Sequence, residues 1–391
     1  MIIVGITLAI FIRNLIAWFE FQPQPSSYSE ITSKDNWDGS SKFTILFIGT
    51  DMVDAEHVFI DHLSIYSLDP RENKLSIFIL NPDIKVTQTT LGYTLHYRTL
   101  LNNRSIDEDK ITLLLSSIEN LLAIKIDRYL MAEKNSFPTF SQFLNPLKVN
   151  VPKEINDEDT IRFPAHEVLS WDKGLQQVLP INFVEFAASD ENGRDDQFQR
   201  QQLLLESITY NLMGFRSILY FPELIKSFEH NIFTDLGKWE LFKLSAKLTS
   251  LKNGDIKKGY LRGAAYEKVI DLGFYDAVTP DINLIDKDIN NIFFDLKVFK
   301  EQARIEVLNG SGVRGLAFNR ARWVRNIGAR VIQVGNSYET VEKTSIYCQE
   351  PEKYQITIAE LQRFLGDEVE VITKDYPNRH VGDIVVVLGV N

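Results

Sequence analysis

Cysteine is almost absent from this sequence, which has a single thiol, Cys348, among 391 residues. One thiol excludes an intramolecular disulfide and any zinc or iron–sulfur site built from several cysteines. Histidine is also scarce, with six scattered residues and no HExxH or comparable spacing, so a histidine-rich metal site is not expected. Cys348 is most simply a packed, unreactive residue.

Positive charge is in deficit, with 42 Lys and Arg against 53 Asp and Glu and a formal net charge of −11. Nucleic-acid affinity comes mainly from neutralising phosphates with basic side chains, so no nucleic-acid partner is expected. Hydrophobic residues make up 44% of the chain and charged residues 24%, the balance of an ordinary folded protein. The length suits roughly two to three domains.

The longest apolar run lies at the start, MIIVGITLAIFIRNLIAWF over residues 1–19. As a helix it would be about 28 Å long, close to the roughly 30 Å hydrocarbon core of a bilayer. Arg13 and Asn14 interrupt it. It fits a signal-anchor, a secretory signal whose basic front end lies upstream, or a buried helix; the lack of an Ala-x-Ala pattern favours the anchor. Residues 20–41, rich in Pro, Ser, Asp and Asn, predict a flexible or extended linker.

Hydrophobic periodicity in the body predicts strands and helices in mixed order. Two apolar runs are separated by the turn-forming residues 69–73, which indicates a hairpin, and a capping box at 105–108 begins a helix. The predicted strands are 43–48, 63–68, 75–80, 126–132 and one ending at 151–152; the predicted helices are 105–122, 137–144, 201–213 and 238–251. The fold class is therefore α/β with a mixed central sheet.

Several segments carry a likeness to a known family: FTILFIGTD (43–51), IDHLSIYSLDPRENKLSIFILNPD (60–83), AIKIDRYLMAEKNSF (123–137), LKVNVP (147–152), RFPAHEVLSWDKGLQQVL (162–179), QRQQLLLESI (199–208) and 231–261. In this order they resemble the catalytic domain of the LytR-CpsA-Psr family. RIEVLNGSGVRGLA and DIVVVLG, within 303–391, resemble the small α/β C-terminal domain found on some members. The expected organisation is a membrane anchor over 1–19, a linker over 20–41, the main domain over 42–265, a connector over 266–302 and the second domain over 303–391.

The resemblance implies a single-pass protein of the cytoplasmic membrane with its bulk outside the cytoplasm. Family members hold a polyprenyl-pyrophosphate lipid in an apolar tunnel and transfer its anionic glycopolymer to the cell wall as a phosphodiester. Such chemistry needs carboxylates that hold Mg²⁺ on the pyrophosphate and arginines that neutralise phosphate oxygens. By position, the resemblance assigns Asp51 and Asp61 to the metal, Asp83 to the acid of a turn that usually carries Arg-Asp, and Arg200 to phosphate.

The arginine half of that site is depleted. Residues other than arginine stand at five positions where the family carries one: Phe59, Pro82, Ala188, Asp190 and Gln197. Arg194 lies one turn from Gln197 and could substitute, while Arg98 and Arg104 are unassigned candidates. Removing one positioned charge donor costs about 100- to 1000-fold in rate, so whether phosphotransfer survives stays open. Asp61 and Asp83 could instead be turn carboxylates that cap backbone amides, and Arg200 a surface ion pair.

A GxGxxG motif spans 310–315 between a predicted strand and helix. A dinucleotide site is disfavoured because the domain has only about 90 residues and the next strand ends in Gly335-Asn336, with no acid for a ribose. A tight strand-to-helix turn is the better interpretation. Arg320, Arg322, Arg325 and Arg330 follow it and form either a solvated charged face or a basic patch for an anionic partner.

Three functions remain open. The first is a Mg²⁺-dependent glycopolymer phosphotransferase or pyrophosphatase. The second is a pseudoenzyme that holds or presents a lipid or wall polymer without catalysis. The third is an envelope scaffold acting through residues 303–391.

Overall fold

The computed structural model describes residues 2–29, 37–54, 57–87, 94–103, 109–134, 146–157, 169–189, 192, 194–212, 220–252, 255–261, 266–269, 277–366 and 369–390. It divides into two compact units: residues 1–115 with 126–280, and residues 116–125 with 281–391. Residues 281–302, predicted as part of a connector, thus belong to the second unit.

The first unit is a mixed α/β domain built on a six-stranded sheet, in the order β11-β6-β1-β2-β3-β12. Its strands are β1 Phe43–Asp54, β2 His57–Asp69, β3 Lys74–Leu80, β6 Arg128–Glu133, β11 Ile232–Thr234 and β12 Ile256–Tyr260. β1 pairs antiparallel with β2 and parallel with β6, which confirms the mixed sheet. The expected strands at 43–48, 63–68, 75–80 and 126–132 are all present.

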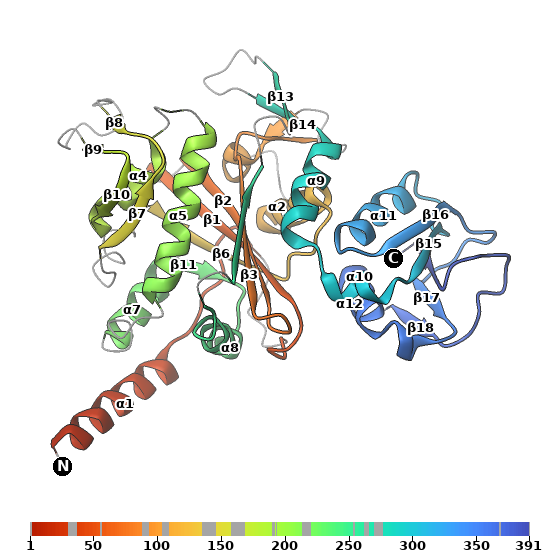
Figure 1. Cartoon of the computed structure of the whole chain (residues 1–391), viewed down its shortest axis with the longest axis horizontal. Coiled ribbons are helices and arrows are strands. Elements are labelled where there is room, and N and C mark those ends of the chain that lie inside the picture. Colours follow the sequence, from red (N-terminus) through yellow and green to blue (C-terminus); the bar gives the residue numbers. More distant parts are fainter. Residues whose placement is uncertain are drawn as a thin grey trace. The chain divides into compact units, whose positions relative to one another are not determined.

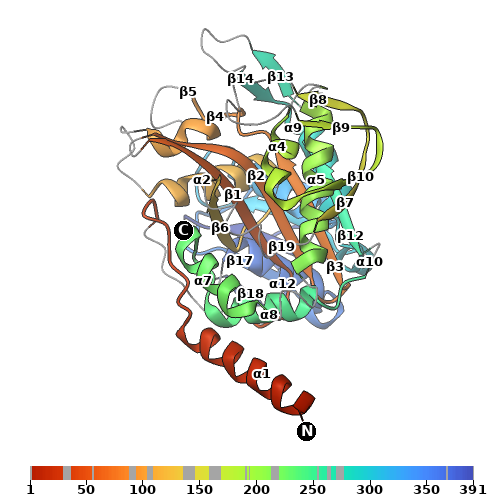
Figure 2. The same cartoon turned by 90° about the vertical axis from the view of Figure 1, so that its left-hand side faces the viewer.

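Helices cover both faces of this sheet. Figures 1 and 2 show α5 on one face and the first turns of α2 on the other. The helices of the first unit are α1 Ile2–Glu20, η1 Tyr97–Asn102, α2 Lys110–Leu122 (whose end lies in the second unit), η3 Pro180–Asn182, α4 Phe183–Ala188, α5 Arg194–Leu212, α7 Phe221–Asn231 and α8 Lys238–Leu248. The predicted helix at 137–144 and the capping box at 105–108 lie outside the described residues.

Four strand pairs complete the first unit. They are formed by β4 Lys85–Thr87 with β5 Thr94–His96, β7 Leu147–Val151 with β10 Gly174–Val178, β8 Ile155–Asp157 with β9 Leu169–Trp171, and β13 Tyr266–Val269 with β14 Ala277–Pro280. The β7–β10 pair and α4 enclose a separate small core that contains Trp171, Phe183 and Phe186.

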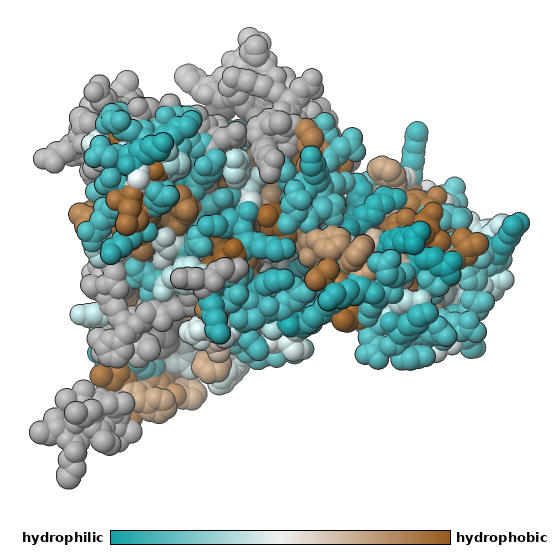
Figure 3. Space-filling view, viewed as in Figure 1, coloured by the Kyte–Doolittle hydropathy of each residue, from teal (hydrophilic) through white to brown (hydrophobic). Residues whose placement is uncertain are grey.

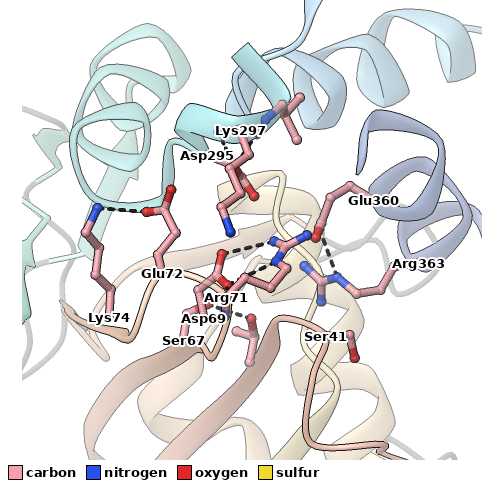
Figure 4. A network of polar contacts seen from close by, with 12 residues as sticks. Ser41, Ser67, Asp69, Arg71, Glu72, Lys74, Asp295, Lys297, Glu360 and Arg363 are labelled. Carbon is pink, nitrogen blue, oxygen red and sulfur yellow. Dashed lines mark hydrogen bonds and ion pairs between the residues drawn. The ribbon is translucent and has the colours of Figure 1, made fainter. Parts of the chain in front are cut away.

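The predicted hairpin turn between β2 and β3 is held by short-range charge pairs, which Figure 4 shows. Arg71 donates from Nε and Nη2 to the two carboxylate oxygens of Asp69, at 3.1 and 3.0 Å. Lys74 pairs with Glu72 at 2.7 Å. Asn73 adopts a positive φ of 52°, a conformation that asparagine tolerates better than most residues.

The helix predicted for residues 1–19 is present as α1. None of the helices in the described part of the chain is both long and apolar enough to cross a membrane. The membrane location stays a prediction. Arg13 and Asn14 are the polar residues that interrupt the apolar run.

The linker predicted over 20–41 is tied to the domain where it is described. Phe21 is 1% exposed, Gln24 forms a bridge with Phe233, and the Ser26 N–H donates to the Tyr129 hydroxyl at 2.8 Å. Residues 30–36 lie outside the described residues. Phe21, Gln24 and Ser26 therefore pack against the first unit, which agrees with the extended form of the predicted linker.

A buried polar centre joins this extended segment to the sheet and to α8. Glu240, which is fully buried, receives two hydrogen bonds from Arg128 and one from the N–H of Trp37. Asp235 lies beside it and accepts the Tyr129 N–H at 2.8 Å. Burial raises the pKa of Asp235 to about 6, and Glu240 adds to that shift.

We expect Asp235→Asn to stabilise the protein at pH 7.5 by about 2 kcal/mol, because asparagine keeps the acceptor without burying a charge. The raised pKa means that the folded protein binds the Asp235 proton more tightly than the unfolded chain does. The Asp235 contribution to wild-type stability should therefore fall as pH rises from about 4 to 6. Urea unfolding of both proteins across this range tests the prediction; parallel pH profiles would contradict it.

The second unit is a smaller α/β domain with a five-stranded sheet in the order β16-β15-β19-β17-β18. Its elements are α9 Ile282–Phe293, α10 Leu296–Glu301, β15 Arg304–Asn309, α11 Leu316–Asn326, β16 Arg330–Asn336, β17 Ser345–Cys348, η5 Pro351–Lys353, α12 Gln355–Leu365, β18 Glu370–Ile372 and β19 Ile384–Leu388. Cys348 is 1% exposed within the main core of this domain.

The GxGxxG segment forms the tight turn between β15 and α11. Gly312 and Gly315 have φ values of 76° and 79°, and Gly315 is the residue before the helix. A Cβ at Gly310 would lie 2.8 Å from Val341 Cγ2. Backbone conformation therefore favours glycine at positions 312 and 315, and the close approach of Val341 favours it at position 310.

The predicted basic face on α11 is partly used by the fold. Arg322 is buried, pairs with Asp286 at 2.6 Å and donates to the carbonyl oxygens of Asn120 and Leu121 at the end of α2. The guanidinium of Arg320 lies 4.8 Å from the Trp323 ring centroid. These contacts explain why residues 116–125 belong to the second unit.

Candidate functional site

Three aspartates and two basic residues meet at the ends of β1, β2 and β3. We call the group formed by Asp51, Asp61, Asp83, Arg98 and Lys134 the Arg98 cluster. Asp51 lies near the end of β1, Asp61 lies within β2, and Asp83 follows β3 in the Asn81-Pro82-Asp83 turn. Arg98 is in η1, and Lys134 directly follows β6.

Arg98 joins two of the predicted site carboxylates. Its Nε donates to Asp83 Oδ1 at 2.5 Å, Nη2 to Asp83 Oδ2 at 3.3 Å and Nη1 to Asp61 Oδ1 at 2.6 Å. The Arg98 N–H also donates to the Pro82 carbonyl at 2.8 Å, which fixes η1 against the turn. The Arg98 and Asp83 side chains are 10% and 4% exposed, whereas Asp61 is 38% exposed. The pair Arg98–Asp83 thus supports Asp61 from the protein interior.

A β-bulge places Asp61. Gly49 pairs with His62 and Thr50 with Ile60, so Asp61 is the extra residue on β2. Bulges bend a strand and redirect a side chain, and they are common beside functional sites. A Cβ at Gly49 would lie 2.9 Å from the His62 Cβ, so glycine permits the close approach of β1 to β2 at this point.

Asp51 is close enough to Asp61 for the two charges to interact. Burial raises the pKa of Asp61, the Arg98 guanidinium opposes that rise, and the Asp51 carboxylate adds to it. Lys134 pairs with Asp51 at 3.0 Å and also lowers the pKa of Asp61. Three carboxylates therefore face two cations.

Asp51 and Asp61 provide carboxylate ligands that Mg²⁺ can bind, but only two of them. No group of three or more His, Cys, Asp or Glu residues that could hold a metal occurs in the described part of the chain. Mg²⁺ commonly binds one or two carboxylates and takes its other ligands from substrate phosphates and water. Asp51 and Asp61 therefore fit an ion that is shared with a bound pyrophosphate, and they do not fit an all-protein cage.

The structure places the other predicted residues elsewhere in the fold. Arg200 is fully buried, pairs with Asp196 at 3.0 Å and donates to the carbonyl oxygens of Phe186 and Ser189 at the end of α4. Arg194 begins α5, but its side chain lies outside the described residues, as do Arg104 and Asp190. The phosphate role predicted for Arg200 and Arg194 stays a prediction.

Two of the positions that lack the expected arginine contact each other. Gln197, which is 6% exposed, donates from Nε2 to the Ala188 carbonyl at 2.7 Å. Glutamine thus joins α4 to α5 without a charge. The sequence pattern assigns no role to Arg98 and does not indicate Lys134. The one signal for Arg98 is its position shortly after the Asn-Pro-Asp turn, in a chain that lacks the other expected arginines.

The strands that carry Asp51 and Asp61 also present an incompletely covered apolar face. Ile45 and Phe47 on β1, Tyr66 on β2 and Leu130 on β6 share this face, because Ile45 is opposite Tyr66 and Phe47 is opposite Leu130. We call these four residues the open face. All four are partly exposed, whereas Leu46, Ile48 and Ile65, which point the other way, are 0% exposed. Alternation along β1 places Asp51 on the side of the open face.

Helix α5 covers the open face in part. Leu205 and Tyr210 of α5 pack against the core cluster to which Ile45, Tyr66 and Leu130 contribute. Burial lowers the pKa of His62 to about 4, so its imidazole is neutral near pH 7. His62 therefore contributes packing and polarity at this place, without a charge.

Known proteins share both the sequence pattern and the fold. Residues 21–288 match the LytR_cpsA_psr family, and residues 302–391 match the domain described as LytR cell envelope-related transcriptional attenuator. A structure of TagV from B. subtilis has a TM-score of 0.51 at 18% identity, covering 63% of this chain and 94% of that one. A structure of a Streptococcus agalactiae protein has a TM-score of 0.50 at 16% identity, covering 63% and 88%.

The mixed sheet with helices on both faces is thus the fold of a known group of α/β proteins. The chain belongs to the LytR_cpsA_psr family, because the family match covers more than half of its length. A curated relative in Enterococcus faecalis is the polyisoprenyl-teichoic acid–peptidoglycan teichoic acid transferase TagU. It is 20% identical over 277 residues, which cover 68% of this chain and 88% of the relative.

Proposed function

We propose that this protein transfers an anionic glycopolymer from a polyprenyl-pyrophosphate lipid to the cell wall, at the Arg98 cluster. The observation that carries the proposal is the bridging of Asp61 and Asp83 by Arg98, with the Asp51–Lys134 pair beside them. The Enterococcus faecalis relative is a teichoic acid transferase, which supports this class of substrate.

The cluster offers each charge that the transfer needs. Arg98 and Lys134 supply positive charge for the phosphate oxygens of the lipid headgroup. These oxygens lose their hydration when the headgroup enters the site. Asp51 and Asp61 would hold a Mg²⁺, which would supply charge neutralisation for the polyprenyl phosphate that leaves when the pyrophosphate bond is broken. Asp83 fixes the Arg98 guanidinium through two hydrogen bonds, and this places the third nitrogen toward Asp61.

The open face supplies an apolar surface on the same side of the sheet as Asp51. A polyprenyl chain is a long hydrocarbon, and covering partly exposed apolar side chains stabilises a complex by about 25 cal/mol per Å² of buried surface. We propose that the lipid lies between the open face and α5, with its pyrophosphate at the Arg98 cluster. The location that this requires is the outer surface of the cytoplasmic membrane, which protease protection of cells and spheroplasts would test.

The proposed transfer is tested with the full chain, Mg²⁺, a polyprenyl-pyrophosphate saccharide and peptidoglycan fragments as acceptor. We expect mass spectrometry to detect a saccharide phosphodiester on the acceptor and polyprenyl monophosphate as the second product. Asp61→Asn should lower product formation about 100-fold or more, and chelation of Mg²⁺ should do the same. Full activity of Asp61→Asn would remove the cluster from the mechanism.

A second candidate function is lipid or polymer holding without catalysis, which the depleted arginine positions and the open face favour. In that case the chain would bind the polyprenyl lipid and form no phosphodiester. Phe47→Asn should weaken binding of the polyprenyl lipid about tenfold or more, because a polar amide replaces an apolar ring on the open face. Leu175→Asn, at a side chain that is 71% exposed on β10, is the matched control and should leave binding unchanged.

A further inference from the structure

A second apolar surface lies far along the sequence from the Arg98 cluster, where α8 meets α1. On α8, Trp239 and Phe242 are 49% and 52% exposed, and their rings contact each other with centroids 6.1 Å apart. A helix that only packs on a core rarely exposes two adjacent large aromatic side chains to solvent. The inner side of the same helix is well used, because Glu240 and Leu244 are buried.

Helix α1 continues this surface. Trp18 lies 6.0 Å from the Phe242 ring centroid, and Lys238 Nζ donates to the Phe19 carbonyl at 2.8 Å. The exposed apolar side chains of α1 are Phe11, Ile12, Leu15, Ile16 and Phe19. Figure 3 shows hydrophobic residues gathered around the C-terminal half of α1.

The basic charges on α8 lie nearer the surface than its acid. Its three lysines, Lys238, Lys243 and Lys247, are partly exposed, and Lys238 and Lys243 donate to the carbonyl oxygens of Phe19 and Trp37. Its one acid, Glu240, is fully buried against Arg128. This occurs in a chain with a formal net charge of −11. On α1, Arg13 is paired with Glu223 at 3.9 Å, and Glu20 is exposed.

We propose that α8 is a membrane-contact helix, in which Trp239 and Phe242 enter the headgroup layer of an anionic bilayer and the positive charges of its lysines attract the lipid phosphates. Tryptophan and other aromatic side chains favour the membrane–water interface. Basic side chains near an anionic surface each contribute about 1 kcal/mol. Continuity with the apolar side chains of α1 and the basic charge of α8 favour a lipid surface over an acidic or uncharged protein partner. The contact holds the body of the first unit on the membrane, whether or not the chain transfers glycopolymer.

Tryptophan quenching by brominated phospholipids tests the proposal with the full chain on phosphatidylglycerol vesicles. Trp239→Phe should lose a large share of the lipid-dependent quenching that the wild type shows. Trp323→Phe is the matched control, because Trp323 is 3% exposed in the second unit, and it should leave the quenching unchanged. Equal quenching of wild type and Trp239→Phe would overturn the proposal.

Vesicle flotation provides the second measurement. Lys238→Gln/Lys243→Gln/Lys247→Gln should reduce binding to phosphatidylglycerol vesicles about 100-fold, from about 1 kcal/mol per lysine, and should make it equal to binding on neutral phosphatidylcholine. Circular dichroism establishes that each variant is folded. Undiminished binding by this triple variant would show that α8 has no anionic-lipid contact.

Discussion

Replacing Arg98 with alanine should lower glycopolymer transfer by about 100-fold or more, the cost of removing one positioned charge donor. It should also destabilise the protein by about 3 kcal/mol, because Asp83 would be left buried without the guanidinium that now satisfies it. Transfer is measured by mass spectrometry of the acceptor, and stability by urea unfolding. Arg304→Ala is a suitable control, since Arg304 pairs with Asp383 at 2.8 Å on the surface of the second unit.

The loss of transfer and the loss of stability can be separated. Arg98→Ala/Asp83→Asn removes the unpaired buried charge and should recover most of the stability, but not transfer. If the double variant recovers both, the Arg98 cluster is a structural ion triad that holds η1 against β2 and β3. If Arg98→Ala alone retains full transfer, the proposed site is wrong.

Arg200→Met should cost about 3 to 5 kcal/mol of stability, which is the second large effect. The substitution leaves Asp196, 4% exposed, without its ion-pair partner and removes donors from the carbonyl oxygens of Phe186 and Ser189. Arg200→Met/Asp196→Leu should recover much of that loss, because it replaces the buried pair by apolar side chains. Urea unfolding of the three proteins measures both values.

The transfer activity of the Arg200 variants also tests the phosphate role that the family resemblance implies for Arg200. If Arg200 acts only in the fold, Arg200→Met/Asp196→Leu should transfer glycopolymer at nearly the wild-type rate once its stability is restored. A stable double variant with transfer reduced about 100-fold would place Arg200 at the phosphate instead.

Much of the first unit could be predicted from hydrophobic periodicity. The runs at 43–48, 63–68 and 75–80 are bounded by turn residues, and each is a strand of the sheet. The packing of the segment from Phe21 to Ser26 could not be predicted in this way, because its Pro and Ser content is typical of a linker. Its attachment depends on tertiary partners distant in sequence, such as Tyr129 and Phe233. The sequence likewise places the end of α2 in the first domain, because its contacts with Arg322 and Asn326 are long-range and leave no local signal.

The sequence predicts the acidic residues of the candidate site better than its basic residues. Asp51, Asp61 and Asp83 follow or lie within recognisable strands, so the pattern locates them. Arg98 contacts Asp61 and Asp83 from a 3₁₀ helix, 15 residues after Asp83. No periodicity in the sequence around Arg98 predicts these contacts. Lys134 meets Asp51 because β6 lies parallel beside β1, a neighbour relation that the sequence alone does not specify. The bulge at Asp61 has the same origin, since it is a property of strand pairing.

The most direct test of the Arg98 cluster as a transfer site is a single-turnover experiment on the folded full chain. Wild type and Arg98→Ala/Asp83→Asn would be loaded with a polyprenyl-pyrophosphate saccharide in Mg²⁺, and polyprenyl monophosphate release would be followed in time. We predict release and an equal amount of acceptor phosphodiester from the wild type, and at least about 100-fold slower release from the variant. Equal release from both proteins, or bound lipid with no release from the wild type, would contradict a catalytic Arg98 cluster.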